Sequence, residues 1–176
     1  MLSLIMSKII LCGINELLVA EWKKLFNYDN VSVVKGSIFE QGADAIVAPG
    51  NSYGFMDGGL DLKISEFFDY KIAPKVKRII RDRPGGKLDV GDALFVETED
   101  TRIPYLIYAP TMVRPQSILG TDNTYMAMKA AMDCINLNYG KLQKVAVPGL
   151  GIGCGEMPPE TAAKQMFKAF IEVGLK

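Results

Sequence analysis

Two glycine-rich segments of this chain carry the residue types best suited to binding chemistry. The first extends from Asp44 to Asp61 and begins with an apolar stretch. Its glycines stand at positions 50, 54, 58 and 59. Gly58-Gly59 come directly before a helical pattern, and bare backbone N–H groups at the start of a helix suit an anion such as a diphosphate. Asn51, just after the apolar stretch, offers an amide that can hydrogen-bond a sugar hydroxyl.

The second segment extends from Val145 to Pro159 and alternates glycine with other residues. Its glycines stand at positions 149, 151, 153 and 155. Alternate glycines let a backbone approach a phosphate closely, although a glycine-rich turn can also do no more than reverse the chain. Two such segments, each after an apolar run, favour a binding site. Neither fits the P-loop, which needs Gly-Lys-Ser/Thr, or the dinucleotide fingerprint after a first strand.

The chain contains no histidine, which narrows the catalytic chemistry open to it. Ser-His and Cys-His nucleophile pairs are excluded, and so are histidine-based metal sites. Asp61 follows Gly58-Gly59 in the first turn of an expected helix, where a carboxylate can activate water. The other interpretation is helix capping, because acids stabilise a first turn whatever the function. Lys63 lies roughly 200° further around the helix, so we expect it to be solvated and to face away from any site at Asp61.

Three further residues are weaker candidates. Thr111 and Arg114 follow an apolar run at residues 105–109, at the expected ligand end of a sheet, and Arg114 can pair with a phosphate or be an ordinary surface charge. Cys154 lies in the second glycine-rich segment, and without a histidine to activate it we expect it to form pocket wall. The chain has three cysteines, whose spacing fits neither a zinc pattern nor a disulfide framework. We therefore expect no metal, no cofactor and a cytoplasmic location.

Short apolar runs alternate with helical patterns along the chain. The apolar runs predict strands at residues 8–12, 31–34, 44–48, 93–96, 105–109 and 144–147. Helical spacing predicts helices at residues 15–26, 60–68, 74–80, 125–139 and from 159 onward. This alternation predicts an α/β fold, a three-layer α/β/α domain with a central mixed, mostly parallel sheet. The short link at residues 97–104 favours one antiparallel pair of strands.

Length and charge set further limits. The chain has 176 residues, which suits one domain covering 1–176. Lys plus Arg equal Asp plus Glu at 20 each, which argues against broad attraction to nucleic acid, so we expect no direct nucleic-acid binding. The apolar start at Met1–Met6 is too short for a signal-peptide core or a membrane span, so we expect no membrane partner.

At its two glycine-rich segments the sequence resembles the macro domain family of ADP-ribose binders. Asp44-Ala45-Ile46-Val47 and Asn51 match a family strand of the form Asp-x-Ile-Val-x-x-x-Asn, and Gly58-Gly59-Leu60-Asp61 fall where the glycine cluster that follows this strand stands. Pro148 to Gly153 match the late loop of the family. A divergent branch with members in phages and fungi carries Met-Asp-Gly-Gly, Ala-Pro-Thr-Met and Pro-Gly-Leu-Gly. These motifs are present here at residues 56–59, 109–112 and 148–151.

Two departures from the common family pattern alter the expected pocket. The common Gly-Asp-Ile, whose acid meets the adenine amino group, is Gly36-Ser37-Ile38 in this chain. The aromatic residue that often covers the ribose is replaced by Cys154-Gly155, so the pocket is expected to be wider there or to be closed by Tyr53 or Phe55.

The resemblance implies a nucleotide ligand like ADP-ribose, free or on an ADP-ribosylated macromolecule. Some macro domains hydrolyse ADP-ribosyl esters or ADP-ribose 1″-phosphate, others only bind, and a scaffold that keeps the fold without the pocket is a third possibility. Asp61 and Asn51 are the expected catalytic residues. The expected ligand-binding residues are Ser37, Ile38, Asn51, Gly58, Gly59, Leu60, Thr111, Gly149, Leu150, Gly151, Ile152, Gly153 and Cys154.

Overall fold

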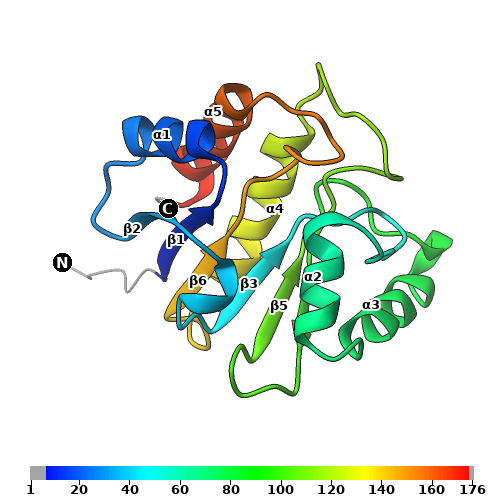
Figure 1. The fold of residues 1–176 in the computed structure, drawn as a ribbon. Coiled ribbons are helices and arrows are strands. Elements are labelled where there is room, and N and C mark those ends of the chain that lie inside the picture. Colours follow the sequence, from blue (N-terminus) through cyan, green and yellow to red (C-terminus); the bar gives the residue numbers. More distant parts are fainter. Residues whose placement is uncertain (1–6, 175–176) are drawn as a thin grey trace.

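The computed structural model describes residues 7–174, which form one six-stranded sheet covered by helices (Figure 1). The apolar start at Met1–Met6 lies outside the described residues. The strands are β1 Lys8–Gly13, β2 Val31–Lys35, β3 Ala45–Ala48, β4 Leu94–Glu97, β5 Tyr105–Tyr108 and β6 Lys144–Val147. Each lies where an apolar run predicted it, within one residue at either end.

The strands are ordered β2-β1-β6-β3-β5-β4 across the sheet. The first five are parallel to one another, and β4 pairs with β5 in the antiparallel sense. The mixed, mostly parallel sheet and its antiparallel pair are therefore confirmed. Because the five parallel strands point the same way, the loops that follow them meet at one edge of the sheet, where ligands bind in open α/β folds.

Helices cover both faces of the sheet. They are α1 Glu16–Leu25, α2 Gly59–Phe67, α3 Ile72–Arg81, α4 Asn123–Leu137 and α5 Pro159–Ala169. Helices α1, α4 and α5 pack together on one face, with Trp22 and Phe170 in their core, while α2 and α3 cover the other face around Ile64 and Val76 (Figure 1). No helix of residues 7–174 is long and apolar enough to cross a membrane. The predicted three-layer α/β/α architecture is confirmed.

Polar side chains set the ends of two helices. Asn15, at the start of the helix predicted over residues 15–26, caps α1, because its Oδ1 accepts a hydrogen bond from the Leu18 N–H at 3.0 Å. Helix α4 ends at Leu137, two residues before the predicted end at Tyr139, which is 63% exposed. Asn138 explains the difference: its Nδ2 donates to the Cys134 carbonyl at 2.8 Å and closes the last turn.

Candidate functional site

The loops at the carboxyl ends of β1, β3, β5 and β6 enclose a cavity of about 530 Å³. The cavity also borders the start of α2 and the 3-10 turn Ile38–Glu40, which follows β2. Every ligand-binding residue predicted from the sequence lines it except Leu150, and the predicted catalytic residues Asp61 and Asn51 line it as well. Its volume falls within the range of about 300–1,000 Å³ that is usual for small-molecule sites.

Leu150 is the one predicted ligand-binding residue that does not line the cavity. Its side chain is fully buried in the core beneath α1, α4 and α5. Its carbonyl accepts a hydrogen bond from Thr124 Oγ1 at 2.8 Å. Gly149 and Gly151 on either side line the cavity.

The loop after β3 is held in shape by Asn51 and Tyr108. Asn51 Nδ2 donates to the Phe55 carbonyl at 2.9 Å, and its Oδ1 accepts from the N–H groups of Tyr53 and Phe55 at 3.1 and 3.2 Å. The buried Tyr108 hydroxyl accepts from the Asn51 N–H at 3.0 Å and donates to the Asn51 carbonyl at 2.9 Å. Gly50 is needed here, because a Cβ at this position would lie 2.1 Å from the Tyr108 ring. Asn51 therefore shapes the cavity wall instead of presenting a free amide.

The loop after β6 leaves a continuous run of backbone N–H groups unbonded. Among the described residues, the N–H groups from Gly149 to Gly155 find no hydrogen-bond acceptor. The loop is held instead through its carbonyls, such as that of Gly151, which accepts from the Met157 N–H at 2.9 Å. A Cβ at Gly151 would lie 2.6 Å from Ile118, so only glycine allows this close packing. Successive free N–H groups beside a cavity form a site for an anion.

Asp61 combines burial with an unpaired carboxylate. It is the third residue of α2, it is 9% exposed, and it lines the cavity. Its Oδ1 has no hydrogen-bond partner among the described residues, and no side chain caps α2. Burial raises the pKa of Asp61 from 3.8 to about 7. A carboxyl group with a pKa near neutral pH can act as a general base.

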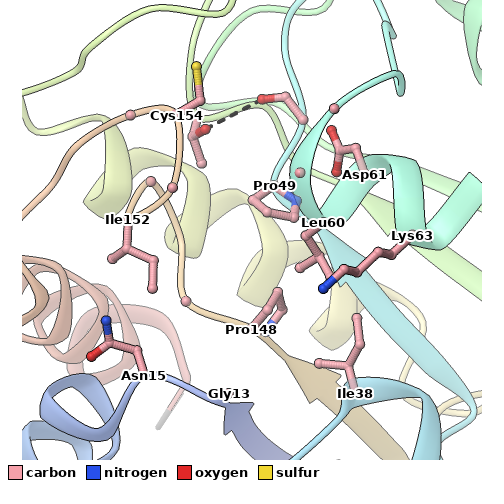
Figure 2. A pocket seen from close by; sticks show the side chains of 18 of the residues that line it. Gly13, Asn15, Ile38, Pro49, Leu60, Asp61, Lys63, Pro148, Ile152 and Cys154 are labelled. Atoms are coloured by element: carbon pink, nitrogen blue, oxygen red, sulfur yellow. Dashed lines mark hydrogen bonds between the residues drawn. The ribbon is translucent and has the colours of Figure 1, made fainter.

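Lys63 is exposed as expected, but the prediction that it would not share a site with Asp61 was wrong. Both residues line the cavity, because the cavity wraps around the first turns of α2. Figure 2 shows Lys63 extending along the rim near Ile38, with Asp61 on the neighbouring part of the helix. A lysine stem of four carbons carries the charge well away from its own position on the helix. Asp57 is exposed on the same rim.

Ser37 and Ile38 form the wall of the cavity after β2. Ser37 caps the short 3-10 turn, with its Oγ accepting from the Phe39 N–H at 3.2 Å. Its hydroxyl hydrogen remains available to a ligand atom that accepts a hydrogen bond. Phe39 also lines the cavity, and its ring stacks on Phe67 with 4.7 Å between centroids. Phe39 was not among the predicted site residues, although its aromatic side chain directly after Ser37 and Ile38 could have indicated a place in the cavity wall.

The end of β1 also forms part of the cavity wall, although it was not among the predicted site residues. Gly13, Ile14 and Asn15 line the cavity, and Figure 2 shows Asn15 facing the rim from the side of α1. These residues have no glycine-rich motif. Their signal was the parallel order of the sheet, because β1 lies between β2 and β6 and must end at the same edge.

The remaining predicted residues lie in the cavity wall, with the exception of Arg114. Thr111 is fully buried in the cavity wall, and Phe55 closes the rim with 44% of its surface exposed. Arg114 lies outside the cavity, with its guanidinium carbon 5.3 Å from the Tyr53 ring centroid. Cys154 is exposed on the cavity wall, as predicted. Within residues 7–174, no three carboxylate or thiol side chains come together as metal ligands would.

Comparison with known proteins identifies the family. A family model described as Macro domain matches residues 47–166. An uncharacterized protein of Aquifex aeolicus is 34% identical over 137 residues, which cover 78% of either chain. The chain therefore belongs to the macro domain family, and the resemblance seen in its glycine-rich segments is confirmed.

Solved structures support the same fold. The macrodomain of Mycobacterium tuberculosis DarG aligns with a TM-score of 0.67 at 19% identity, over 79% of this chain and 88% of that chain. Thermosipho africanus DarTG in complex with ADP-ribose aligns with a TM-score of 0.60 at 16% identity, over 90% of this chain and 49% of that chain. At these identities the likeness concerns the fold.

Proposed function

We propose that this protein binds ADP-ribose, or a close derivative of it, in the cavity at the carboxyl edge of the sheet. One observation carries the proposal: the unbonded N–H groups of Gly149–Gly155 and the unpaired carboxylate of Asp61 line one cavity. The first group suits a diphosphate and the second suits chemistry on an attached sugar. A neighbour in fold, Thermosipho africanus DarTG in complex with ADP-ribose, supports the same ligand class.

The placement of the ligand follows from the charges of the wall. Lys63 is the one cation among the lining residues, so the diphosphate is held mainly by backbone N–H groups of the second glycine loop. Ser37 and Phe39 then receive the adenine, through a hydroxyl hydrogen and an aromatic face. The distal ribose lies at Asp61, beyond Gly58-Gly59.

We further propose that Asp61 hydrolyses a bond at the distal ribose, in an ADP-ribosyl ester or ADP-ribose 1″-phosphate. Its carboxylate takes one proton from a water molecule as the water oxygen bonds to the anomeric carbon. The bond from that carbon to the leaving carboxylate or phosphate breaks, and the leaving group departs with the electron pair. Asn51 acts by holding the loop that faces this reaction, since its side chain is engaged within the loop. A non-catalytic reader of ADP-ribose remains the alternative.

Binding is tested by calorimetric titration with ADP-ribose, with AMP as the comparison ligand. A Cβ at Gly153 would meet no heavy atom within 4 Å, so Gly153→Ala should fold and bind normally. Gly153→Glu should fold equally well but lose ADP-ribose, because its charged side chain projects where the diphosphate lies. We expect at least a roughly hundredfold loss of affinity, about 2.7 kcal/mol. An absence of ADP-ribose binding by the unmodified protein would overturn the proposal.

Hydrolysis is tested with Asp61→Asn, which keeps the shape of the side chain. We expect hydrolysis of an ADP-ribosyl ester or of ADP-ribose 1″-phosphate to fall by about 10²–10⁴-fold, the usual contribution of a general base, with binding retained. Equal hydrolysis by the variant would leave the reader function in place and remove the base from Asp61.

We also propose that residues 1–176 form a single macro-like domain of a cytoplasmic protein. Strands β1 and β6 lie 136 positions apart at their first residues yet pair side by side in the centre of the sheet, so early and late parts of the chain share one core. Unfolding in denaturant should follow one cooperative transition by circular dichroism and by Trp22 fluorescence. Two separate transitions would contradict a single domain.

A further inference from the structure

The segment from Lys71 to Lys87 concentrates positive charge in a chain whose charges otherwise balance. It contains seven lysines and arginines but one acidic residue, Asp82, whereas the whole chain has 20 of each sign. Helix α3 occupies most of this segment and holds no aspartate or glutamate. We expected no nucleic-acid binding because the total charge is neutral. The chain nevertheless contains this basic region.

Helix α3 displays its charges on one face. Ile72, Val76 and Ile80 are buried against the sheet. Lys77, Arg78 and Arg81 are exposed on the opposite side, and among the described residues none of the three forms an ion pair. We call Lys77, Arg78 and Arg81 the α3 cations. Cations near the carboxyl end of a helix are also favoured by the helix dipole, so these charges alone identify no ligand.

A pair of aromatic rings connects the α3 cations to the rim of the cavity. Lys77 Nζ lies 5.1 Å from the centroid of the Phe55 ring. The rings of Phe55 and Tyr53 have centroids 6.3 Å apart, and the Arg114 guanidinium carbon lies 5.3 Å from the Tyr53 ring centroid. Gly54 allows the loop to lie against α3, because its φ is +75° and a Cβ there would meet Ile80 at 3.1 Å. Two rings thus stand between cations on either side.

We propose that the α3 cations, Phe55, Tyr53 and Arg114 together bind a single-stranded nucleic acid. Proteins that bind single strands combine cations for the phosphates with aromatic rings on which bases stack. Phe55 is 44% exposed and lines the cavity, so the bound strand passes next to the ligand pocket. An acidic protein would complement the cations but has no need of two partly exposed rings between them. This inference does not rest on the proposed function, since Phe55 is the one residue of the surface that also lines the pocket.

The test is fluorescence anisotropy with a labelled single-stranded oligonucleotide, as DNA and as RNA, over a series of salt concentrations. In the triple variant K77A/R78A/R81A we expect at least a tenfold loss of affinity. The slope of log affinity against log salt should fall by about 2, since each phosphate contact on a single strand contributes about 0.7. Phe55→Ala should also weaken binding by roughly tenfold, because one stacked base is lost.

The matched control removes the same charge from the other face of the sheet. Lys23, Lys129 and Lys168 are exposed on α1, α4 and α5, so K23A/K129A/K168A should bind the oligonucleotide as the unmodified protein does. Equal weakening by both triple variants, or no binding of the oligonucleotide at low salt, would overturn the inference. So would equal competition by poly-glutamate, which would assign the surface to acidic proteins.

Calorimetry with ADP-ribose separates this inference from the proposed function. The K77A/R78A/R81A variant should bind ADP-ribose with unchanged affinity, because none of the α3 cations lines the cavity. Loss of the oligonucleotide with ADP-ribose retained supports two adjoining sites. Loss of both would show that the α3 cations act through the fold or the pocket, and it would contradict a separate surface.

Discussion

The two glycine-rich loops look alike in sequence but are built in opposite ways. In the loop after β3, the N–H groups from Gly50 to Phe55 all donate hydrogen bonds within the protein. In the loop after β6, those from Gly149 to Gly155 have no acceptor among the described residues. Glycine allows close packing in both loops, at Gly50 against Tyr108 and at Gly151 against Ile118, so the loops differ in whether their backbone N–H groups are bonded.

This difference suits the two loops to different roles in the site. The first loop is fixed by side chains, Asn51 and Tyr108, and leads to the one buried carboxylate of the cavity, Asp61. A fixed loop suits a group that must be placed against a reacting atom. The second loop offers unbonded backbone N–H groups, which can donate hydrogen bonds to an anion. The variants described below test these separate roles of the two loops, and they are given in order of decreasing expected effect.

The buried carboxylate of the first loop should make stability depend on pH. The pKa of Asp61 is about 7 in the folded protein and 3.8 when unfolded, so the folded state holds the proton more tightly. The contribution of Asp61 to stability is then greatest below about pH 4, falls between about pH 4 and 7, and is level above, a loss of roughly 4 kcal/mol. Urea denaturation across this range should show the fall in the unmodified protein but not in Asp61→Asn. Parallel curves for the two proteins would contradict a raised pKa.

Gly50 and Gly153 should respond differently to a single methyl group. Gly50→Ala places a Cβ 2.1 Å from the Tyr108 ring, so we expect a loss of about 3 kcal/mol from overpacking. Gly153→Ala meets open space and should change stability by less than about 0.5 kcal/mol. Thermal and urea denaturation measure both. Similar losses in the two variants would contradict the difference in packing between Gly50 and Gly153.

Loss of the hydrogen bonds that hold the first loop should destabilise the protein more than loss of the hydrogen bond behind the second loop. Tyr108→Phe leaves the Asn51 N–H unpaired in the interior and leaves the Asn51 carbonyl with the Gly54 N–H alone, which should cost about 2 kcal/mol. Thr124→Val removes one hydrogen bond, to the Leu150 carbonyl behind the second loop, and should cost about 1 kcal/mol. Denaturation of the two variants in parallel measures the difference, and a greater loss in Thr124→Val would reverse the comparison.

Cys154→Ser should have the smallest effect. The thiol is exposed on the second loop, and the chain has no histidine to activate it. We expect stability within about 0.5 kcal/mol of the unmodified protein and unchanged hydrolysis of ADP-ribosyl substrates. A loss of hydrolysis with binding retained would instead give Cys154 a place in the reaction.

Local patterns in the sequence were enough for much of this site. Asp61 was predicted because a strand, a glycine pair and a helix follow one another within a short span, and each leaves a periodic signal. The basic segment of α3 was equally visible in the sequence, yet the balanced total charge concealed it. A total charge averages over the surface, whereas a ligand meets a single patch.

The strands, most of each helix, the fold class and the two loops that form the site could be predicted from the sequence, because they depend on periodicity and on glycine placement. The three-dimensional packing was needed to show that Leu150 turns to the core, that Lys63 and Asp61 share one cavity, and that Phe39 and Asn15 join them. It also decided the raised pKa of Asp61, which burial sets. Directions of side chains and the exclusion of water depend on neighbours brought together from distant parts of the chain, and no local pattern records them.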